Sequence, residues 1–213
     1  MKFERLLHLV GNRGVFDLAT VTQLSDDSRQ TVRTQLHRWS RAGKLIPLRR
    51  GMYALASRYR RTEINTAVLA NSLYTPSYLS LQWALGYFGL IPEKVVTLTS
   101  VTTRQPRRFR NEFGTFRYRT LSTSSFFGYR REPVDGQTVM LAEPEKALLD
   151  FWHLEKGEWV PPRMSGMRFQ NAGRINERTL REYARRWRSP RLTRAVDVWS
   201  EVVREENRGS VEL

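Results

Sequence analysis

The side chains best suited to specific chemistry in this chain lie between residues 28 and 42, with two more arginines shortly after. They carry amide, hydroxyl, imidazole and guanidinium groups, and no carboxylate interrupts them. Arginine can pair with guanine and glutamine with adenine, while threonine can contact a phosphate or a thymine methyl group. We expect base contacts from Gln30, Arg33, Thr34 and His37. We expect phosphate contacts from Ser28, Arg29, Arg38, Arg41, Arg49 and Arg50.

A helix must present these groups on one face. Val32, Leu36 and Trp39 recur at i, i+4 and i+7, which predicts an apolar stripe on a helix from about Ser28 until Gly43 stops it. The opposite face is polar. An ordinary solvated face usually mixes glutamate with lysine or arginine, because such pairs stabilise a helix. The lack of Asp and Glu here favours nucleic-acid recognition over a solvated face.

Two shorter helices are predicted before this one, over residues 3–10 and 16–24. The segment 25–28, Ser-Asp-Asp-Ser, is rich in helix-capping and turn residues, so it predicts a tight turn before the third helix. The pair of helices joined by this turn is typical of a helix-turn-helix.

A β-hairpin is predicted next, because two short and largely apolar segments, residues 45–48 and 52–55, lie on either side of a polar tip with Gly51. Its tip carries Arg49 and Arg50, and neighbouring like charges repel unless a partner compensates them. A hairpin after the third helix is what a winged helix-turn-helix adds. We therefore expect a DNA-binding winged helix-turn-helix over residues 1–60, with the arginine tip facing a phosphate backbone.

The composition agrees with a polyanionic partner. The 213 residues include 36 Lys and Arg against 21 Asp and Glu, a net charge of +15. Residues 1–60 hold 12 basic and 4 acidic side chains, residues 61–160 hold 12 and 10, and residues 161–213 hold 12 and 7. Such a surplus favours DNA or RNA as partner. Compositional bias toward arginine and a role in solubility are the alternative explanation.

The absence of cysteine excludes disulfides and thiolate metal sites, and it fits a reducing compartment. Glu4 and His8 interrupt the N-terminal apolar residues, so no signal peptide is expected. No stretch approaches the roughly 20 apolar residues that a membrane span needs. We therefore expect a cytoplasmic protein without a membrane partner.

The second part of the chain, residues 61–213, predicts a mixed domain, so the expected fold class is α+β with a small β-sheet and several helices. We expect helices over 63–73, 78–88, 143–154, 176–187 and 190–206. We expect strands over 95–101, 115–121, 126–130 and 137–141. The arginine-rich residues 102–114 predict a loop or hairpin tip, and residues 157–175 predict a long loop.

Catalytic motifs are absent: the chain has no GxGxxG, phosphate loop or GxSxG, and its three histidines are far apart. We predict no catalytic residue, metal or cofactor, and no enzyme activity. The alternative is a metal-dependent nuclease with a winged-helix targeting module, using Asp135, Glu143, Glu145 and Lys146. Pro144 favours a helix start at this point, however, and a strand would send Glu145 and Lys146 to opposite faces.

The basic helix expected over 176–187 and its C-terminal flank form a possible second nucleic-acid surface. Its members are Arg178, Arg181, Arg185, Arg186 and Arg188. Glu177 and Glu182 interleave with them, so a solvated helix is an equally good interpretation. The expected basic helical end of the chain spans residues 176–206.

Several separated blocks together resemble the AbiEi-type antitoxins over roughly residues 1–200. They are RRGMYAL, SYLSLQWALGYFGLIPE, VVTLTSVTTR, FGTFRYRTL, FFGY and LAEPEKALLDF. The resemblance implies a type IV toxin–antitoxin system. The winged helix would repress its own operon by binding operator DNA upstream of it. The C-terminal domain, residues 61–213, would counter an AbiEii-type nucleotidyltransferase toxin without forming a stable complex, and could contribute to DNA binding. A ligand-responsive transcriptional regulator is a further alternative.

Overall fold

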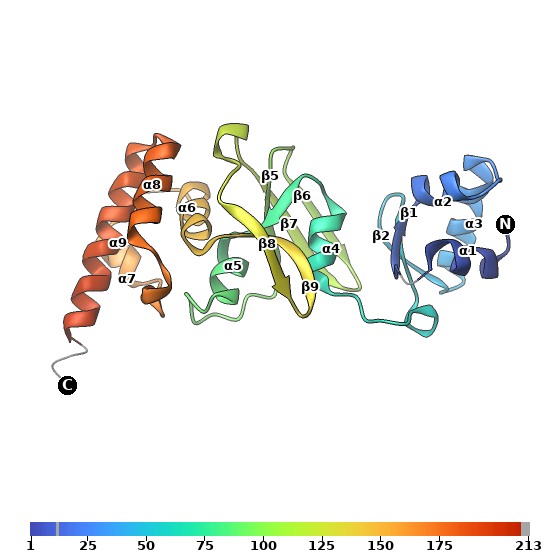
Figure 1. Ribbon diagram of the computed structural model, residues 1–213, viewed down its shortest axis with the longest axis horizontal. Helices are drawn as coiled ribbons and strands as arrows, with labels where there is room; N and C mark the ends of the chain where they lie inside the picture. Colours follow the sequence, from blue (N-terminus) through green and yellow to red (C-terminus); the bar gives the residue numbers. More distant parts are fainter. Residues whose placement is uncertain (12, 210–213) are drawn as a thin grey trace.

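The computed structural model describes residues 1–11 and 13–209, and the side chains of these as far as residue 205. The molecule is elongated, and its parts follow one another along the longest axis (Figure 1). A helical unit with a small sheet occupies one end, a six-stranded sheet lies in the middle, and the last helices form the other end. The chain is a mixed α+β protein, as expected.

The N-terminal unit is built from three helices and three antiparallel strands in the sheet order β1-β3-β2. In chain order they are α1 (Phe3–Val10), β1 (Val15–Asp17), α2 (Leu18–Leu24), α3 (Arg29–Arg41), β2 (Leu45–Arg49) and β3 (Met52–Leu55). The helices pack around a small core that includes Leu6, Val32 and Leu36, each fully buried. The predicted helices over 3–10 and 28–42 and the hairpin are confirmed.

The helix predicted over 16–24 is shorter than expected. Val15, Phe16 and Asp17 form β1, which pairs with Ala54, Tyr53 and Met52 of β3, and the helix begins at Leu18. The physical reason is the ladder offered by β3, which sequence periodicity around residue 16 does not reveal. Asp17 ends the strand and caps the helix, because its carboxylate accepts a hydrogen bond from the backbone N–H of Thr20.

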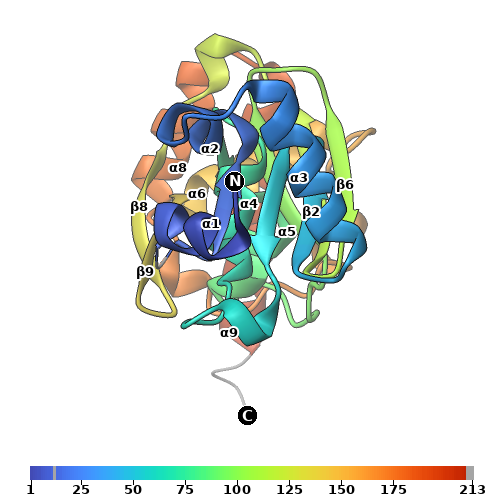
Figure 2. The ribbon, with the colours of Figure 1, turned by 90° about the vertical axis from the view of Figure 1, so that its right-hand side faces the viewer.

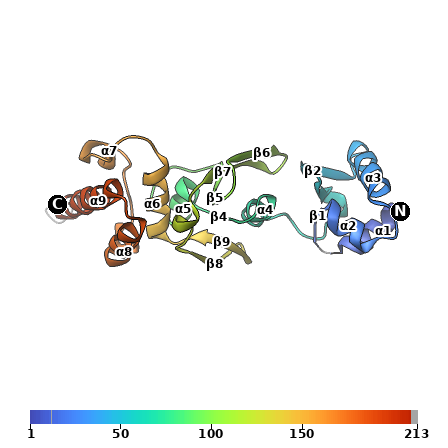
Figure 3. The ribbon, with the colours of Figure 1, turned by 90° about the horizontal axis from the view of Figure 1, so that it is seen from above.

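The six-stranded sheet has the order β6-β7-β5-β4-β9-β8 and mixes parallel with antiparallel pairs. Its strands are β4 (Ser77–Leu79), β5 (Leu98–Thr102), β6 (Arg107–Asn111), β7 (Gly114–Thr120), β8 (Tyr129–Val134) and β9 (Gln137–Ala142). Helix α4 (Thr66–Leu73) lies between this sheet and the N-terminal unit, whereas α5 (Leu81–Tyr87) and α6 (Pro144–Leu154) cover the far face (Figures 1 and 3).

Two predictions for this region are wrong, and both enlarge the sheet. The helix predicted over 78–88 begins only at Leu81, because residues 77–79 form the central strand β4, hydrogen-bonded to β5 and β9. The arginine-rich residues 102–114, predicted as a loop or hairpin tip, contain in addition the edge strand β6, which pairs with β7 from Arg107 to Asn111, so only residues 112–113 form a hairpin tip. An edge strand can carry many charges because one side of it faces solvent.

The C-terminal end consists of α7 (Pro161–Ser165), α8 (Glu177–Trp187) and α9 (Pro190–Gly209), with α8 and α9 packed on α6. The loop predicted over 157–175 therefore holds the short helix α7 and a 3-10 turn, η3 (Ala172–Arg174). Two further 3-10 turns are η1 (Ser57–Tyr59) and η2 (Thr123–Ser125). No helix in the described ranges is long and apolar enough to cross a membrane.

Candidate nucleic-acid interface

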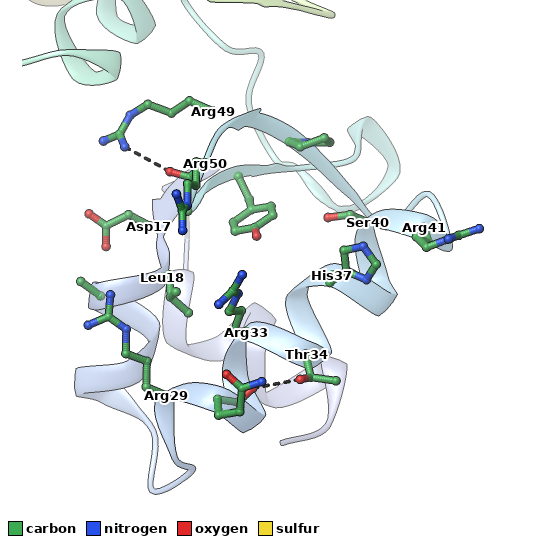
Figure 4. A pocket seen from close by; sticks show the side chains of 15 residues that line it. Asp17, Leu18, Arg29, Arg33, Thr34, His37, Ser40, Arg41, Arg49 and Arg50 are labelled. Carbon is green, nitrogen blue, oxygen red and sulfur yellow. Dashed lines mark hydrogen bonds between the residues drawn. The ribbon is translucent and has the colours of Figure 1, made fainter.

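A hollow with a volume of about 1100 Å³ lies between α3, the start of α2 and the β2–β3 hairpin. Eight of the predicted contact residues line this hollow: Arg29, Gln30, Arg33, Thr34, His37, Arg41, Arg49 and Arg50. Figure 4 shows them arranged around the hollow, with α3 on one side and the hairpin on the other. We call this region the concave surface.

Helix α3 supplies most of the concave surface, because its apolar stripe fixes its rotation. Val32 and Leu36 are fully buried, and Trp39 packs edge-to-face on Phe3 with ring centroids 5.2 Å apart. Burying each aliphatic side chain contributes about 1.5–3 kcal/mol. The predicted base-contacting side chains of Gln30, Arg33, Thr34 and His37 are consequently exposed, as the helical period requires.

The N-terminus of α3 is capped by Ser28, whose hydroxyl accepts a hydrogen bond of 3.2 Å from the backbone N–H of Thr31. Ser28 and Arg38 are exposed but lie outside the lining of the concave surface. The Thr34 hydroxyl donates to the carbonyl of Gln30 at 3.0 Å and keeps its lone pairs and methyl group available. Of the predicted contact residues, Ser28 and Arg38 are therefore the two that the concave surface does not include.

The hairpin tip is positioned by backbone chemistry. Gly51 has a φ of +75°, a conformation that glycine adopts without strain, and its carbonyl accepts a hydrogen bond of 2.8 Å from the N–H of Leu18 at the start of α2. Arg50 is exposed and points toward α3, whereas Arg49 extends away from α3 (Figure 4). The two neighbouring arginines thus differ in orientation, which the sequence did not predict.

Seven further residues line the same surface and were not predicted from the sequence: Asp17, Leu18, Ala19, Ser40, Pro47, Gly51 and Tyr53. Asp17 introduces a negative charge. Hydrogen bonds from the Thr20 backbone lower the pKa of its carboxyl below the usual value, and nearby Arg49 lowers it further, so Asp17 is ionised at neutral pH. Tyr53 could have been found from the alternation of β3, since Met52 and Ala54 on either side of it are buried.

The arginines of α8 do not act as one group. Arg181 donates to Asp197 at 2.6 Å and to Glu177 at 2.8 Å, and the Arg186 guanidinium lies 3.9 Å from the Phe127 ring centroid. Arg185 and Arg188 line a second hollow with Arg194 at the start of α9. Arg178 is exposed on α8. Only part of the predicted row is therefore gathered in one place.

The acidic residues of the nuclease alternative have separate partners. Glu145 accepts the N–H of Asn176 at 2.7 Å, Glu143 accepts the hydroxyl of Tyr183, and Lys146 pairs with Asp150 inside the core. Asp135 is exposed in the turn between β8 and β9. In the part of the chain that the structure describes, no three His, Cys, Asp or Glu residues could hold a metal ion together.

Comparison with known proteins agrees with the geometry of the N-terminal unit. No curated protein matches the chain. A family model does match, and its matched region contains α1 to β3 almost completely, together with all the residues that line the concave surface. Residues 4–56 of this chain match the family described as "Transcriptional regulator, AbiEi antitoxin".

Proposed function

We propose that residues 1–60 form a winged helix-turn-helix that binds operator DNA and represses the protein's own operon. In this proposal α2 and α3 are the helix-turn-helix, and the β2–β3 hairpin is the wing. Helix α3 enters the major groove, where Gln30, Arg33, Thr34 and His37 contact bases. Ser28, Arg29, Arg38, Arg41, Arg49 and Arg50 are the proposed phosphate contacts.

The observation that carries the proposal is the concave surface itself. It combines one helix free of carboxylates with an arginine at a hairpin tip on a single concave surface. Helix α3 has 13 residues and is about 20 Å long at 1.5 Å per residue. A major groove is about 12 Å wide, which is enough for the diameter of an α-helix lying along it. Asp17 is the one carboxylate in the lining.

A second group of arginines lies on the same side of the molecule. Strand β6 carries Arg107, Arg108 and Arg110, all exposed, and Figures 2 and 3 place β6 on the side of α3. Arg108 lies opposite Arg117 of β7. Positive charge beside the proposed groove contact adds to the attraction for phosphate without reading sequence.

Residues 61–213 form, in this proposal, the antitoxin domain that counters a nucleotidyltransferase toxin of the AbiEii type. The family match of the N-terminal unit supports an antitoxin and regulator role for the protein. The toxin's identity is to be tested directly. Co-expression with a nucleotidyltransferase encoded beside this gene should restore growth, and cells that express the toxin without this chain give the comparison.

The decisive experiment for the DNA proposal is a titration of the purified protein against the DNA upstream of its own start codon. A scrambled duplex of equal length is the control, and both are measured at several salt concentrations. We expect at least about 1,000-fold preference for the upstream DNA at physiological salt, as specific DNA-binding proteins show. Equal and steeply salt-dependent binding to both duplexes would contradict the repressor proposal.

Replacing Asp17 by asparagine should strengthen binding to every duplex. The asparagine side chain still accepts the Thr20 N–H and keeps α2 capped, while the negative charge that faces the phosphates is removed. We expect a gain of about 0.2–1 kcal/mol, the range of charge interactions near a surface. Affinities for operator and scrambled DNA, measured beside a melting curve, test this. An unchanged affinity would mean that Asp17 does not face DNA.

A further inference from the structure

The strand β2 contains an irregularity next to the wing arginines. In the β2–β3 ladder Pro47 lies opposite Tyr53 and Arg49 lies opposite Met52, so Leu48 is an extra residue without a ladder partner. Such a bulge redirects the side chain of the extra residue and bends the strand. Here the Leu48 side chain is 3% exposed and belongs to the large core of residues 61–213, not to the small N-terminal core.

The backbone of Leu48 is held by the same neighbour. Its carbonyl accepts a hydrogen bond of 3.3 Å from the side-chain amide of Asn111, the last residue of β6. The Asn111 side-chain oxygen accepts the N–H of Phe113 at 2.9 Å, which shapes the turn between β6 and β7. One side chain thus links the β6–β7 turn to the bulge of the wing.

A second contact follows the wing in sequence. The Arg60 side chain is 7% exposed, and its guanidinium lies 5.2 Å from the ring centroid of Phe113 at the β6–β7 turn. Met52 and Ala54 of β3 also belong to the large core. The wing is therefore held along β2 by Asn111 and after β3 by Phe113.

The orientation of the two wing arginines agrees with this hold. Arg49 is half-buried, and its guanidinium donates to the carbonyl of Arg50 at 3.3 Å. The charge of Arg49 also acts on Tyr118 of β7. Burial raises the pKa of the Tyr118 hydroxyl, and the positive charge of Arg49 opposes that rise. The charge of Arg49 thus acts both on Asp17 at the concave surface and on Tyr118 of the six-stranded sheet, whereas Arg50 is directed at the concave surface (Figure 4).

We propose that the β6–β7 hairpin is a positioning element for DNA binding, in which Asn111 and Phe113 hold the wing so that Arg50 meets a phosphate while α3 occupies the groove. This inference rests on the proposed DNA-binding function. In this inference Asn111 and Phe113, which are far from α3 in the sequence, determine where the wing lies relative to α3. Neither residue contacts DNA.

The test variant is Asn111→Ser. A serine hydroxyl can still accept the Phe113 N–H, but it is too short to reach the Leu48 carbonyl. Phe113→Leu is the second variant, which keeps apolar packing and removes the aromatic face for Arg60. The matched control is Asn171→Ser, which removes an amide-to-carbonyl hydrogen bond of 2.8 Å to Gly89, beyond the six-stranded sheet from α3.

The measurement is a double-mutant comparison with Arg50→Ala on the full chain, using both the upstream and the scrambled duplex. We expect Asn111→Ser and Phe113→Leu to lower affinity about threefold to tenfold and to reduce the slope of log affinity against log salt by about 0.9, the value of one phosphate contact. Arg50→Ala should then cost much less in either background than in the wild type. Asn171→Ser should change neither affinity nor slope.

The outcomes separate the two proposals. If Arg50→Ala costs the same factor with and without Asn111→Ser and Phe113→Leu, the positioning role is wrong, whatever the loss of stability. If the wild-type protein binds both duplexes equally, the repressor proposal is wrong. The positioning role can still be judged in that case, because a phosphate contact is read equally well on either duplex.

Discussion

Replacing Asp150 by alanine is expected to lower the free energy of unfolding by about 3–5 kcal/mol, because it leaves a buried charge unpaired. Asp150 and Lys146 are both 0% exposed and form an ion pair on α6. The Asp150 carboxylate also accepts the Ser80 hydroxyl at 2.6 Å and the Tyr78 hydroxyl at 3.0 Å. The substitution therefore removes the acceptor of three buried donors at once.

Burial makes the remaining lysine costly. Desolvation lowers the pKa of Lys146 below the usual value, and Asp150 opposes that shift, so the carboxylate favours the charged ammonium. The ammonium also lies 4.3 Å from the Trp187 ring centroid and 2.9 Å from the Tyr78 hydroxyl. These contacts join β4, α6 and α8, so we expect the loss to be global rather than local.

Urea denaturation at neutral pH measures this effect, and Glu93→Ala is the matched control. Glu93 pairs with Arg168 at 3.0 Å on the surface, where such a pair contributes about 0–1 kcal/mol. The double variant Lys146→Met/Asp150→Leu should recover much of the stability lost in Asp150→Ala, because it leaves no buried charge. Equal losses for Asp150→Ala and Glu93→Ala would contradict this account of the core.

Replacing Arg33 by alanine is expected to relax sequence preference at one or two base pairs of the operator and to cost about 1–3 kcal/mol there. Arg33 is exposed near the middle of the polar face of α3 and lines the concave surface. A guanidinium in this place can donate two hydrogen bonds to guanine, and alanine can donate none. Binding to scrambled DNA should change little.

Arg50→Ala is the matched control for Arg33→Ala, since it removes the same side chain from the wing tip. It should weaken binding to all duplexes and make the salt dependence less steep, as loss of a phosphate contact does. Arg49→Ala should act in the same direction, because Arg49 is also a proposed phosphate contact. Affinities for a panel of single-base operator variants distinguish the two effects. Equal losses for Arg33→Ala and Arg50→Ala on operator and scrambled DNA would refute this division.

The helix α3 could be predicted from the sequence because its determinants are local. Ser28 caps it, Val32 and Leu36 set its buried stripe, and it ends at Arg41, two residues before Gly43. The hairpin could be predicted for the same reason, since its two apolar segments and Gly51 act within a few residues. Together these elements placed the polar face of α3 and the wing tip on one surface without further information.

The strand β4 could not be predicted, because its partners are distant in the sequence. The strand β6 was missed although its partner β7 follows after a two-residue turn, because its charged residues do not show the apolar pattern of a strand. Leu79 of β4 pairs with Leu141, and residues 77–79 look like the start of a helix when read alone. Strand β6 carries three arginines and becomes a strand only through β7. The bulge at Leu48 was not predicted either, because its side chain is buried by residues that lie far along the chain, in the core of residues 61–213.

The elongated shape of the molecule affects whether partners at its two ends could contact each other. Helices α3 and α9 lie at opposite ends of the longest axis, with α4, the six-stranded sheet and α6 stacked between them (Figure 1). Each packed layer is roughly 10 Å thick. If α3 binds a duplex as proposed, a macromolecule held at α8 and α9 would be separated from that duplex by these layers. The proposal therefore predicts that binding at one end of the molecule does not sterically exclude binding at the other.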